Sequence, residues 1–170
     1  MVTPLANVRP TVPMLKEVKL LREFTESELG QLIQLGSSAV YEAHTNVVIE
    51  GELSWGLYLI LDGVVGIYKN NKLNGDLYDV GQLRQGSFFG EMSLVDENPR
   101  SATVRALTDC QLFYISKDAF NGLMDKNNEL KIRFYGSCVK DLVSRLRELD
   151  DNYVVSQYQL WKTVIQKEAA

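Results

Sequence analysis

Residues 86 to 106 read GSFFGEMSLVDENPRSATVRA, and they are chemically the most informative part of the chain. Gly90 permits close approach of the backbone, and residues 91 to 95 can form one helical turn whose N–H groups would attract an anion. Arg100 follows after a loop and could pair bidentately with a phosphate. Glu91 would repel that phosphate, but its carboxylate suits a sugar hydroxyl as an acceptor. The segment therefore predicts a site for a ribose phosphate.

Each of these residues also has a structural explanation when it is taken singly. An arginine and a glutamate close together usually form a surface ion pair worth about 0–1 kcal/mol. Gly90 could serve only as a turn residue. The prediction of a ligand site rests on the combination of residues, and a fold whose pocket no longer binds is the alternative.

Around this segment, short β-rich runs alternate with turn residues. The candidate strands are residues 39–42, 46–50, 56–61, 64–69, 77–83, 102–107 and 110–115. Short strands with turn signals every 8 to 12 residues favour an all-β sandwich or barrel. Asp62-Gly63 predicts a hairpin between two of them, and residues 70 to 75 predict a second, exposed hairpin loop.

Helical patterns flank the β region on its N-terminal side. Residues 1 to 13 hold three of the four prolines and are expected to form an irregular arm. Residues 14 to 36 follow with apolar side chains at helical spacing. Thr25 and Glu28 have the spacing of a capping box, so a second helix is predicted to begin there.

The C-terminal part predicts a short helix at residues 117–124 and then one long helix. No Gly-Pro breaker interrupts residues 130 to 167, which would span about 57 Å as a helix. An apolar seam with alternating spacings of three and four, as in a heptad repeat, runs through Ile132, Tyr135, Val139, Leu142, Leu146, Leu149, Tyr153, Ser156 and Leu160. A helix packed only on its own domain is the alternative, but the β domain is far shorter than this helix. We therefore predict a homodimer through residues 130–160.

Composition excludes several classes of protein. The chain has 170 residues, a formal net charge of −4 and a pI of about 5.1, whereas direct DNA binding usually needs a basic face. No apolar run approaches the ~20 residues of a membrane span, and we expect no signal peptide, because the apolar stretch after Met1 is short and broken by prolines. Because the chain has only two cysteines, we expect a cytoplasmic protein. From its charge and hydropathy, we expect direct contact with neither DNA nor a membrane.

An enzyme is also disfavoured. Metal-dependent jelly-roll enzymes need at least two histidines beside a carboxylate, and the chain has one histidine, His44. That histidine would also have to serve any Ser-His-Asp or Cys-His arrangement. We therefore predict no catalytic residues, no metal and no cofactor.

The segment from Gly86 to Ala106 resembles the phosphate-binding cassette of the cyclic-nucleotide-binding domain family, whose pattern is F-G-E, a loop, and then P-R-x-A-T-V-x-A. The runs Val48-Ile-Glu-Gly-Glu52 and Tyr58-Leu-Ile-Leu-Asp-Gly63 fit the same family. The resemblance covers roughly residues 15 to 150. It implies a mainly β fold with flanking helices, namely a β jelly-roll barrel followed by a long C-terminal helix.

The resemblance also implies roles for single residues. Glu91 should take the ribose 2′-hydroxyl and Arg100 should neutralise the cyclic phosphate of cAMP or cGMP. The remaining residues expected to line the ligand are Gly90, Met92, Ser93, Ser101 and Ala102. Ile67 and Gly81 lie on strands expected to flank the base. The long helix resembles that of the catabolite-activator-like regulators, which places Ser144 and Arg145 near the base, and Arg145 could donate to guanine O6 and N7.

Three parts are therefore predicted: an arm at residues 1–13, a cyclic-nucleotide-binding barrel with N-terminal helices at 14–128, and a dimerisation and signalling helix at 129–170. Nothing after residue 150 resembles the winged helix-turn-helix of the bacterial regulators. The predicted function is a cyclic-nucleotide sensor that signals through its C-terminal helix to a downstream protein effector, as a stand-alone receptor or as part of a longer protein. The alternative is a dimerisation scaffold with a vestigial pocket.

Overall fold

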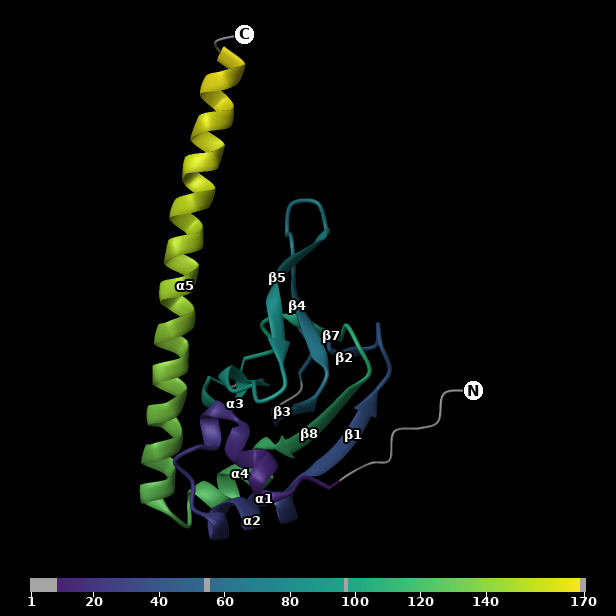
Figure 1. Ribbon diagram of the computed structural model, residues 1–170, viewed down its shortest axis with the longest axis vertical. Coiled ribbons are helices and arrows are strands. Elements are labelled where there is room, and N and C mark those ends of the chain that lie inside the picture. The colour runs from purple at the N-terminus through teal and green to yellow at the C-terminus, as the bar shows by residue number, and fades with distance from the viewer. Residues whose placement is uncertain (1–8, 54–55, 97, 169–170) are drawn as a thin grey trace. The chain divides into compact units, whose positions relative to one another are not determined.

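The computed structural model describes residues 9–53, 56–96 and 98–168 (Figure 1). The chain divides into two compact units, residues 1–134 and residues 135–170. The first unit holds all the strands and the short helices. The second unit is the greater part of one long helix, α5 (Asn128–Glu168).

The first unit is built on two antiparallel four-stranded sheets. In one sheet the order is β1 (Ser37–Tyr41), β8 (Cys110–Ser116), β3 (Gly56–Asp62) and β6 (Phe88–Phe89); in the other it is β2 (Asn46–Val48), β7 (Thr103–Ala106), β4 (Val64–Asn70) and β5 (Leu77–Arg84). This arrangement confirms the predicted jelly-roll barrel. The two-residue strand β6 was not predicted, because two residues are too few for an alternating pattern.

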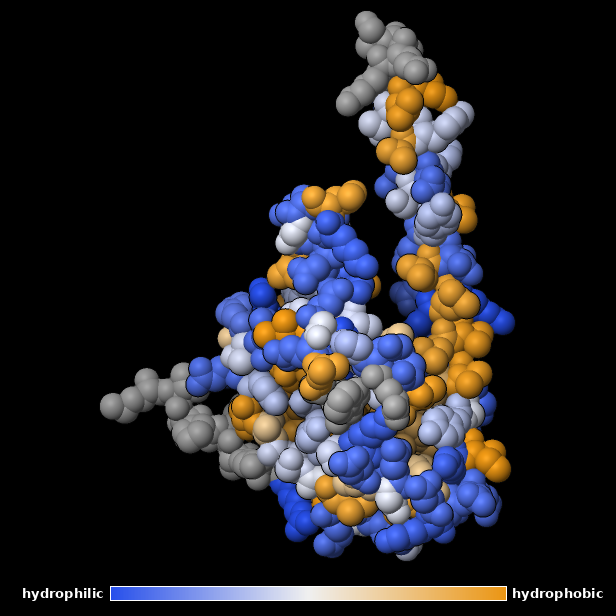
Figure 2. Space-filling model, turned by 180° about the vertical axis from the view of Figure 1, so that it is seen from behind, coloured by the Kyte–Doolittle hydropathy of each residue, from blue (hydrophilic) through white to orange (hydrophobic). Residues whose placement is uncertain are grey.

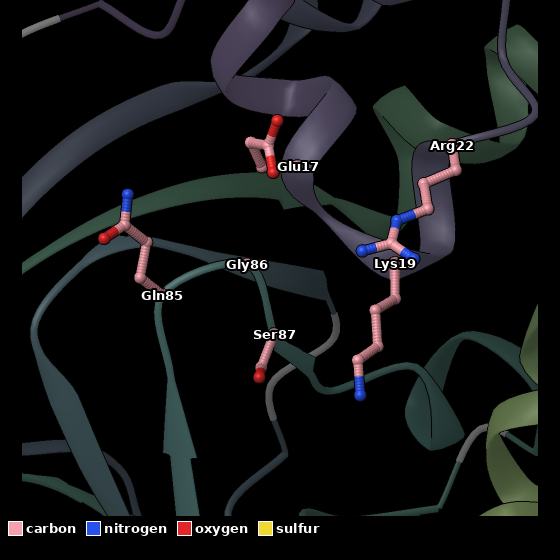
Figure 3. A pocket seen from close by; sticks show the side chains of 6 residues that line it. All are labelled: Glu17, Lys19, Arg22, Gln85, Gly86 and Ser87. Carbon is pink, nitrogen blue, oxygen red and sulfur yellow. The ribbon is translucent and has the colours of Figure 1, made fainter.

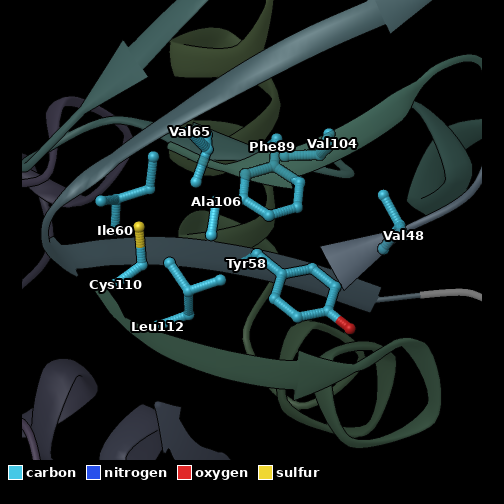
Figure 4. Close-up of a cluster of buried hydrophobic side chains, with 9 residues drawn as sticks. All are labelled: Val48, Tyr58, Ile60, Val65, Phe89, Val104, Ala106, Cys110 and Leu112. Atoms are coloured by element: carbon cyan, nitrogen blue, oxygen red, sulfur yellow. The ribbon is translucent and has the colours of Figure 1, made fainter. Parts of the chain in front are cut away.

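Apolar side chains from both sheets fill the space between them. Figure 4 shows the buried cluster, which consists of Val48, Tyr58, Ile60, Val65, Phe89, Val104, Ala106, Cys110 and Leu112. Strand β3 contributes more than one face to the core, since residues 56 to 61 are all buried. A strand covered on both sides reads as a continuous apolar run, which explains the sequence GLYLIL. This core fixes the sheets against each other.

Within the described part of the first unit, five short helical segments accompany the barrel. They are α1 (Val12–Glu17), the 3₁₀ helix at Lys19–Leu21, α2 (Glu26–Leu35), α3 (Met92–Val95) and α4 (Lys117–Met124). The predicted capping box is confirmed: Thr25 Oγ1 accepts from the Glu28 amide, and the Glu28 carboxylate accepts from the Thr25 amide. In Figure 1, α1, α2 and α4 gather at one end of the barrel. The helix predicted at residues 117–124 has those same bounds.

Helix α1 begins at Val12, inside the stretch that the sequence analysis assigned to an irregular arm. Thr11 caps it by accepting from the Met14 amide, and Pro13 lies in the first turn, where a missing N–H costs nothing. Residues 1 to 8 of that arm lie outside the described residues. The predicted boundaries at 13 and 128 stay predictions.

Helix α5 is continuous from Asn128 to Glu168, as the absence of a breaker predicted. Its first turns belong to the first unit, where Leu130 and Phe134 are buried and the Phe134 ring packs against Phe120 of α4. Beyond them, apolar side chains recur along the helix, as the orange residues of Figure 2 show. Seam residues remain largely exposed within the chain; Leu146 is 56% and Leu149 61% exposed.

Candidate functional site

The segment predicted to bind an anion forms a tight turn followed by one turn of helix. Strand β6 ends at Phe89, Gly90 follows with a positive φ, and Glu91 is the N-cap of α3. The predicted helical turn at residues 91–95 is therefore present. Ser93 is buried, and its hydroxyl donates to the carbonyl of Gly90 at 2.9 Å, which closes the turn on itself.

Gly90 satisfies two constraints that only glycine can meet. Its φ of +89° lies in the left-handed region, which disfavours any residue with a Cβ. A Cβ at this position would also collide with the carbonyl oxygen of Gly56 and with Nη1 of Arg100. The glycine thus allows the arginine side chain to pass directly over the backbone of the turn.

Arg100 is the central residue of the site, and only 4% of its surface is exposed. Its Nη1 donates to the carbonyl of Gly56 and to the hydroxyl of Ser93, both at 3.1 Å. Its guanidinium carbon lies 5.6 Å from the centre of the Tyr58 ring, which adds a cation–π contact. Strand β3 and helix α3 therefore hold the guanidinium from two sides.

Acidic groups surround this buried cation. Burial lowers the pKa of Arg100, while the nearby Tyr58, Tyr114, Glu91 and Glu52 act in the opposite direction. Glu91 is itself buried, with 3% of its surface exposed. An arginine keeps its charge in proteins, so the site combines a fixed positive charge with a buried carboxylate.

The sequence analysis did not predict that aromatic rings pack next to Arg100. The ring of Tyr58 stacks on that of Phe89 with centroids 4.8 Å apart (Figure 4). The ring of Tyr114 packs against Tyr58 at the same separation. Burial raises the pKa of the Tyr58 hydroxyl. Tyr58 belonged to a predicted core strand, and no spacing rule separates a core tyrosine from one that contacts an arginine.

The other predicted ligand contacts differ in exposure. Met92 is 46% exposed, and its sulfur lies 3.7 Å from the hydroxyl of Ser101, which is also exposed. Ala102 is half-buried. The structure thus brings residues from both ends of the 90–102 segment together, with Arg100 and Ser93 buried and Met92 and Ser101 at the surface.

The predicted base contacts fall in two places. Ile67 and Gly81 face each other as a register pair on β4 and β5, next to a bulge in the pairing. Ser144 and Arg145 lie on α5 in the second unit, where Arg145 Nε pairs with the Asp141 carboxylate at 2.6 Å. Contact of these four residues with a base stays a prediction.

A separate hollow of about 270 Å³ lies where the 3₁₀ helix meets the turn after β5. Figure 3 shows the residues that line it, which are Glu17, Lys19, Arg22, Gln85, Gly86 and Ser87. The charged side chains of this hollow are exposed and carry opposite signs, in contrast to the buried Arg100. It shares no residue with the site around Arg100.

None of the helices in the described ranges is long and apolar enough to pass through a bilayer. Among the same residues, no cluster of three or more His, Cys, Asp or Glu side chains is arranged to hold a metal ion.

Comparison with known proteins places this geometry in one family. The sequence model described as "Cyclic nucleotide-binding domain" matches residues 39–127. The cAMP-dependent protein kinase regulatory subunit of Yarrowia lipolytica is 36% identical over 110 residues, which are 65% of this chain and 28% of that protein. The chain matches only about a quarter of the length of such relatives.

Solved structures of this kind have a fold similar to that of this chain. The regulatory domain of Toxoplasma gondii PKA, crystallised with cAMP, superposes with a TM-score of 0.61 and 28% identity, over 66% of this chain and 42% of that one. The catabolite activator protein of Thermus thermophilus gives a TM-score of 0.67 and 26% identity, over 78% of this chain and 60% of that one.

Proposed function

The chain belongs to the cyclic nucleotide-binding domain family, and from this premise we propose that it binds cAMP or cGMP and signals occupancy through α5, as a cytoplasmic homodimer. The ligand site comprises Gly90, Glu91, Met92, Ser93, Arg100, Ser101 and Ala102. The single observation that carries this proposal is the buried Arg100, held over the Gly90 turn beside the buried Glu91. A buried cation of this kind costs free energy unless an anion or dipoles compensate it.

Arg100 and Glu91 would contact different parts of the ligand. A cyclic phosphate carries one negative charge, which the guanidinium of Arg100 would neutralise. The carboxylate of Glu91 would accept a hydrogen bond from the ribose 2′-hydroxyl, and a deoxyribose would forfeit it. The site would therefore prefer a ribonucleotide to a deoxyribonucleotide, with the phosphate on Arg100.

Two observations bear on the choice of base, and they point to different nucleotides. The Yarrowia lipolytica relative is named as a regulatory subunit of a cAMP-dependent protein kinase, and the Toxoplasma gondii domain was crystallised with cAMP, which favours adenine. Arg145, as a guanine contact, would favour cGMP. We rank cAMP first, and competition between the two nucleotides decides the order.

The signalling part of the proposal rests on α5. Its apolar seam is exposed within the chain, and such a seam is buried when two helices pair. A ligand changes the position of α5 only if it binds the conformation with one α5 position more tightly than the conformation with another. A protein effector, such as the kinase implied by the relatives' names, would then respond to α5.

Isothermal titration of the full chain with cAMP and cGMP tests ligand binding. We expect saturable binding by the wild type and a loss of about 100-fold or more for Arg100→Ala, since a charge-assisted phosphate contact is worth about 3 kcal/mol. Arg84→Ala, which removes an exposed arginine at the end of β5, is the matched control and should bind normally. Absence of binding at 100 µM in wild type and Arg100→Ala alike would contradict the proposal.

The alternative is a dimerisation scaffold with a vestigial pocket, and the exposed seam of α5 favours it as a second candidate. A scaffold would melt at the same temperature with and without nucleotide. A ligand at 100 times its Kd instead stabilises the folded state by about 2.7 kcal/mol. Thermal melting of the wild type with and without each nucleotide separates the two functions.

A further inference from the structure

Glu50 lies in the loop that joins β2 to β3, outside the segment already assigned to the ligand. Both of its carboxylate oxygens have partners on β4: Oε1 accepts from Lys69 Nζ at 2.7 Å, and Oε2 accepts from the Asn70 amide at 2.8 Å. These hydrogen bonds, from Asn70 first and then from Lys69, lower the pKa of the Glu50 carboxyl. The ionised Glu50 side chain thereby joins this loop to strand β4.

The same loop runs alongside the segment that carries Arg100. The Gly51 amide donates to the Arg100 carbonyl at 2.9 Å, and the Arg100 amide donates to the Glu52 carbonyl at 3.0 Å. The Glu50 amide donates to Thr103 Oγ1 at 3.0 Å. The backbone of Arg100 is therefore paired on both its N–H and its C=O with residues 51 and 52.

Lys69 closes the connection from the other side. Besides Glu50, its ammonium donates to the carbonyl of Ser101, the residue after Arg100. One lysine on β4 thus contacts both the loop and the segment that follows the buried arginine. The Lys69 side chain is half exposed, whereas that of Glu50 is 16% exposed.

We infer that Glu50 and Lys69 are positioning residues for Arg100: they hold the loop at residues 50–52 and the segment at residues 100–103 against β4, so that the guanidinium stands where the cyclic phosphate binds. This inference rests on the proposed function. Neither residue is assigned a contact with the ligand, and both act through the backbone of Arg100. A supporting residue of this kind matters because a small displacement of a binding group costs much of its interaction energy.

An ordinary surface ion pair is the competing explanation, and it is worth about 0–1 kcal/mol without any effect on a distant group. The two explanations differ in what a substitution does to Arg100. A surface pair predicts no change in ligand affinity. A positioning role predicts a loss of affinity that depends on the presence of Arg100.

The test is a double-mutant cycle on the full chain, with cAMP titrated by calorimetry. We expect Glu50→Ala and Lys69→Met each to weaken binding by about 10-fold in the wild-type background, within the coupling range known for residues that share one network. In an Arg100→Lys background the same changes should weaken binding by less than about 2-fold. Lys69→Arg should restore binding, and Lys126→Met, which removes an exposed lysine elsewhere, should leave it unchanged.

A second readout does not depend on affinity. The Nε–Hε NMR signal of Arg100, assigned by its absence from Arg100→Lys, should shift in Glu50→Ala and in Lys69→Met but not in Lys126→Met. If the wild type binds and Arg100→Ala does not, while Glu50→Ala and Lys69→Met bind within 2-fold and leave this signal in place, the inference alone fails. If the wild type binds neither cAMP nor cGMP, the proposed function fails and this inference fails with it.

Discussion

Gly90 shows how a single atom can decide the site, because its missing Cβ leaves room for the guanidinium of Arg100. We expect Gly90→Ala to displace that guanidinium and to weaken nucleotide binding by about 100-fold. The left-handed φ adds a loss of unfolding free energy of about 1 kcal/mol or more. Calorimetric titration and urea unfolding measure the two effects separately.

Gly75 offers the matched control for that substitution. It has a φ of +78° in the loop between β4 and β5, and no atom lies within 4 Å of a Cβ built there. Gly75→Ala should therefore cost stability through backbone strain alone and bind nucleotide like the wild type. Equal losses of affinity in the two variants would show that strain, and not the collision with Arg100, disables the site.

Under the proposed function, α5 pairs with α5 of a second copy of the chain. Leu149 lies on its seam, and Val155 lies on the outward side at similar exposure, 61% against 54%. Each leucine buried in a symmetric pair counts twice, so removing one should cost about 3 kcal/mol or more. We expect Leu149→Asp to raise the dimer dissociation constant by about 100-fold or more.

Sedimentation velocity over a range of concentrations measures this change, and Val155→Asp, which adds the same charge away from the seam, is the control. A wild type that remains monomeric at 100 µM would contradict the homodimer. Equal effects of both substitutions would show that α5 associates through another face.

At the scale of the whole molecule, one buried carboxylate joins the N-terminal helices to the first turns of α5 within the first unit. Glu28 of α2 accepts hydrogen bonds from the Thr25 amide and from Arg133, and Arg133 also donates to the carbonyl of Glu23 at 2.7 Å. Burial alone would raise the pKa of Glu28, but the hydrogen bonds from Thr25 and Arg133 outweigh it and lower the pKa below its ordinary value of 4.5.

A carboxyl with a lowered pKa stabilises the fold in its ionised form, so its contribution is complete above about pH 4.5 and is lost as the pH falls through the lower, folded-state pKa. We expect Glu28→Gln to lower the free energy of unfolding by about 1–3 kcal/mol at pH 7. The difference from the wild type should shrink below pH 4.5. Urea unfolding between pH 7 and pH 3.5 measures it, with Glu26→Gln in the exposed part of the same turn as control. A difference that is constant with pH would exclude the ionised carboxylate as its cause.

Local patterns in the sequence determined most of the elements. Three examples are the capping box at Thr25, the turn at Gly90 and the continuous helix after Asn128. Each depends on interactions between residues a few positions apart, so the sequence alone is enough to predict it. The combination of Gly90, Glu91 and Arg100 also predicted the family, and the match of the cyclic nucleotide-binding domain model to residues 39–127 confirms that prediction.

Only the tertiary structure decided which distant groups meet Arg100. These groups are the carbonyl of Gly56, the ring of Tyr58, and the positioning residues Glu50 and Lys69. They come from strands and loops about 30 to 50 residues away in sequence, and sheet pairing alone brings them together. No spacing rule encodes such contacts, because they depend on the order and register of strands in both sheets. The sequence therefore determined the groups that would hold a ribose phosphate, and the packing of the barrel decided what holds those groups in place.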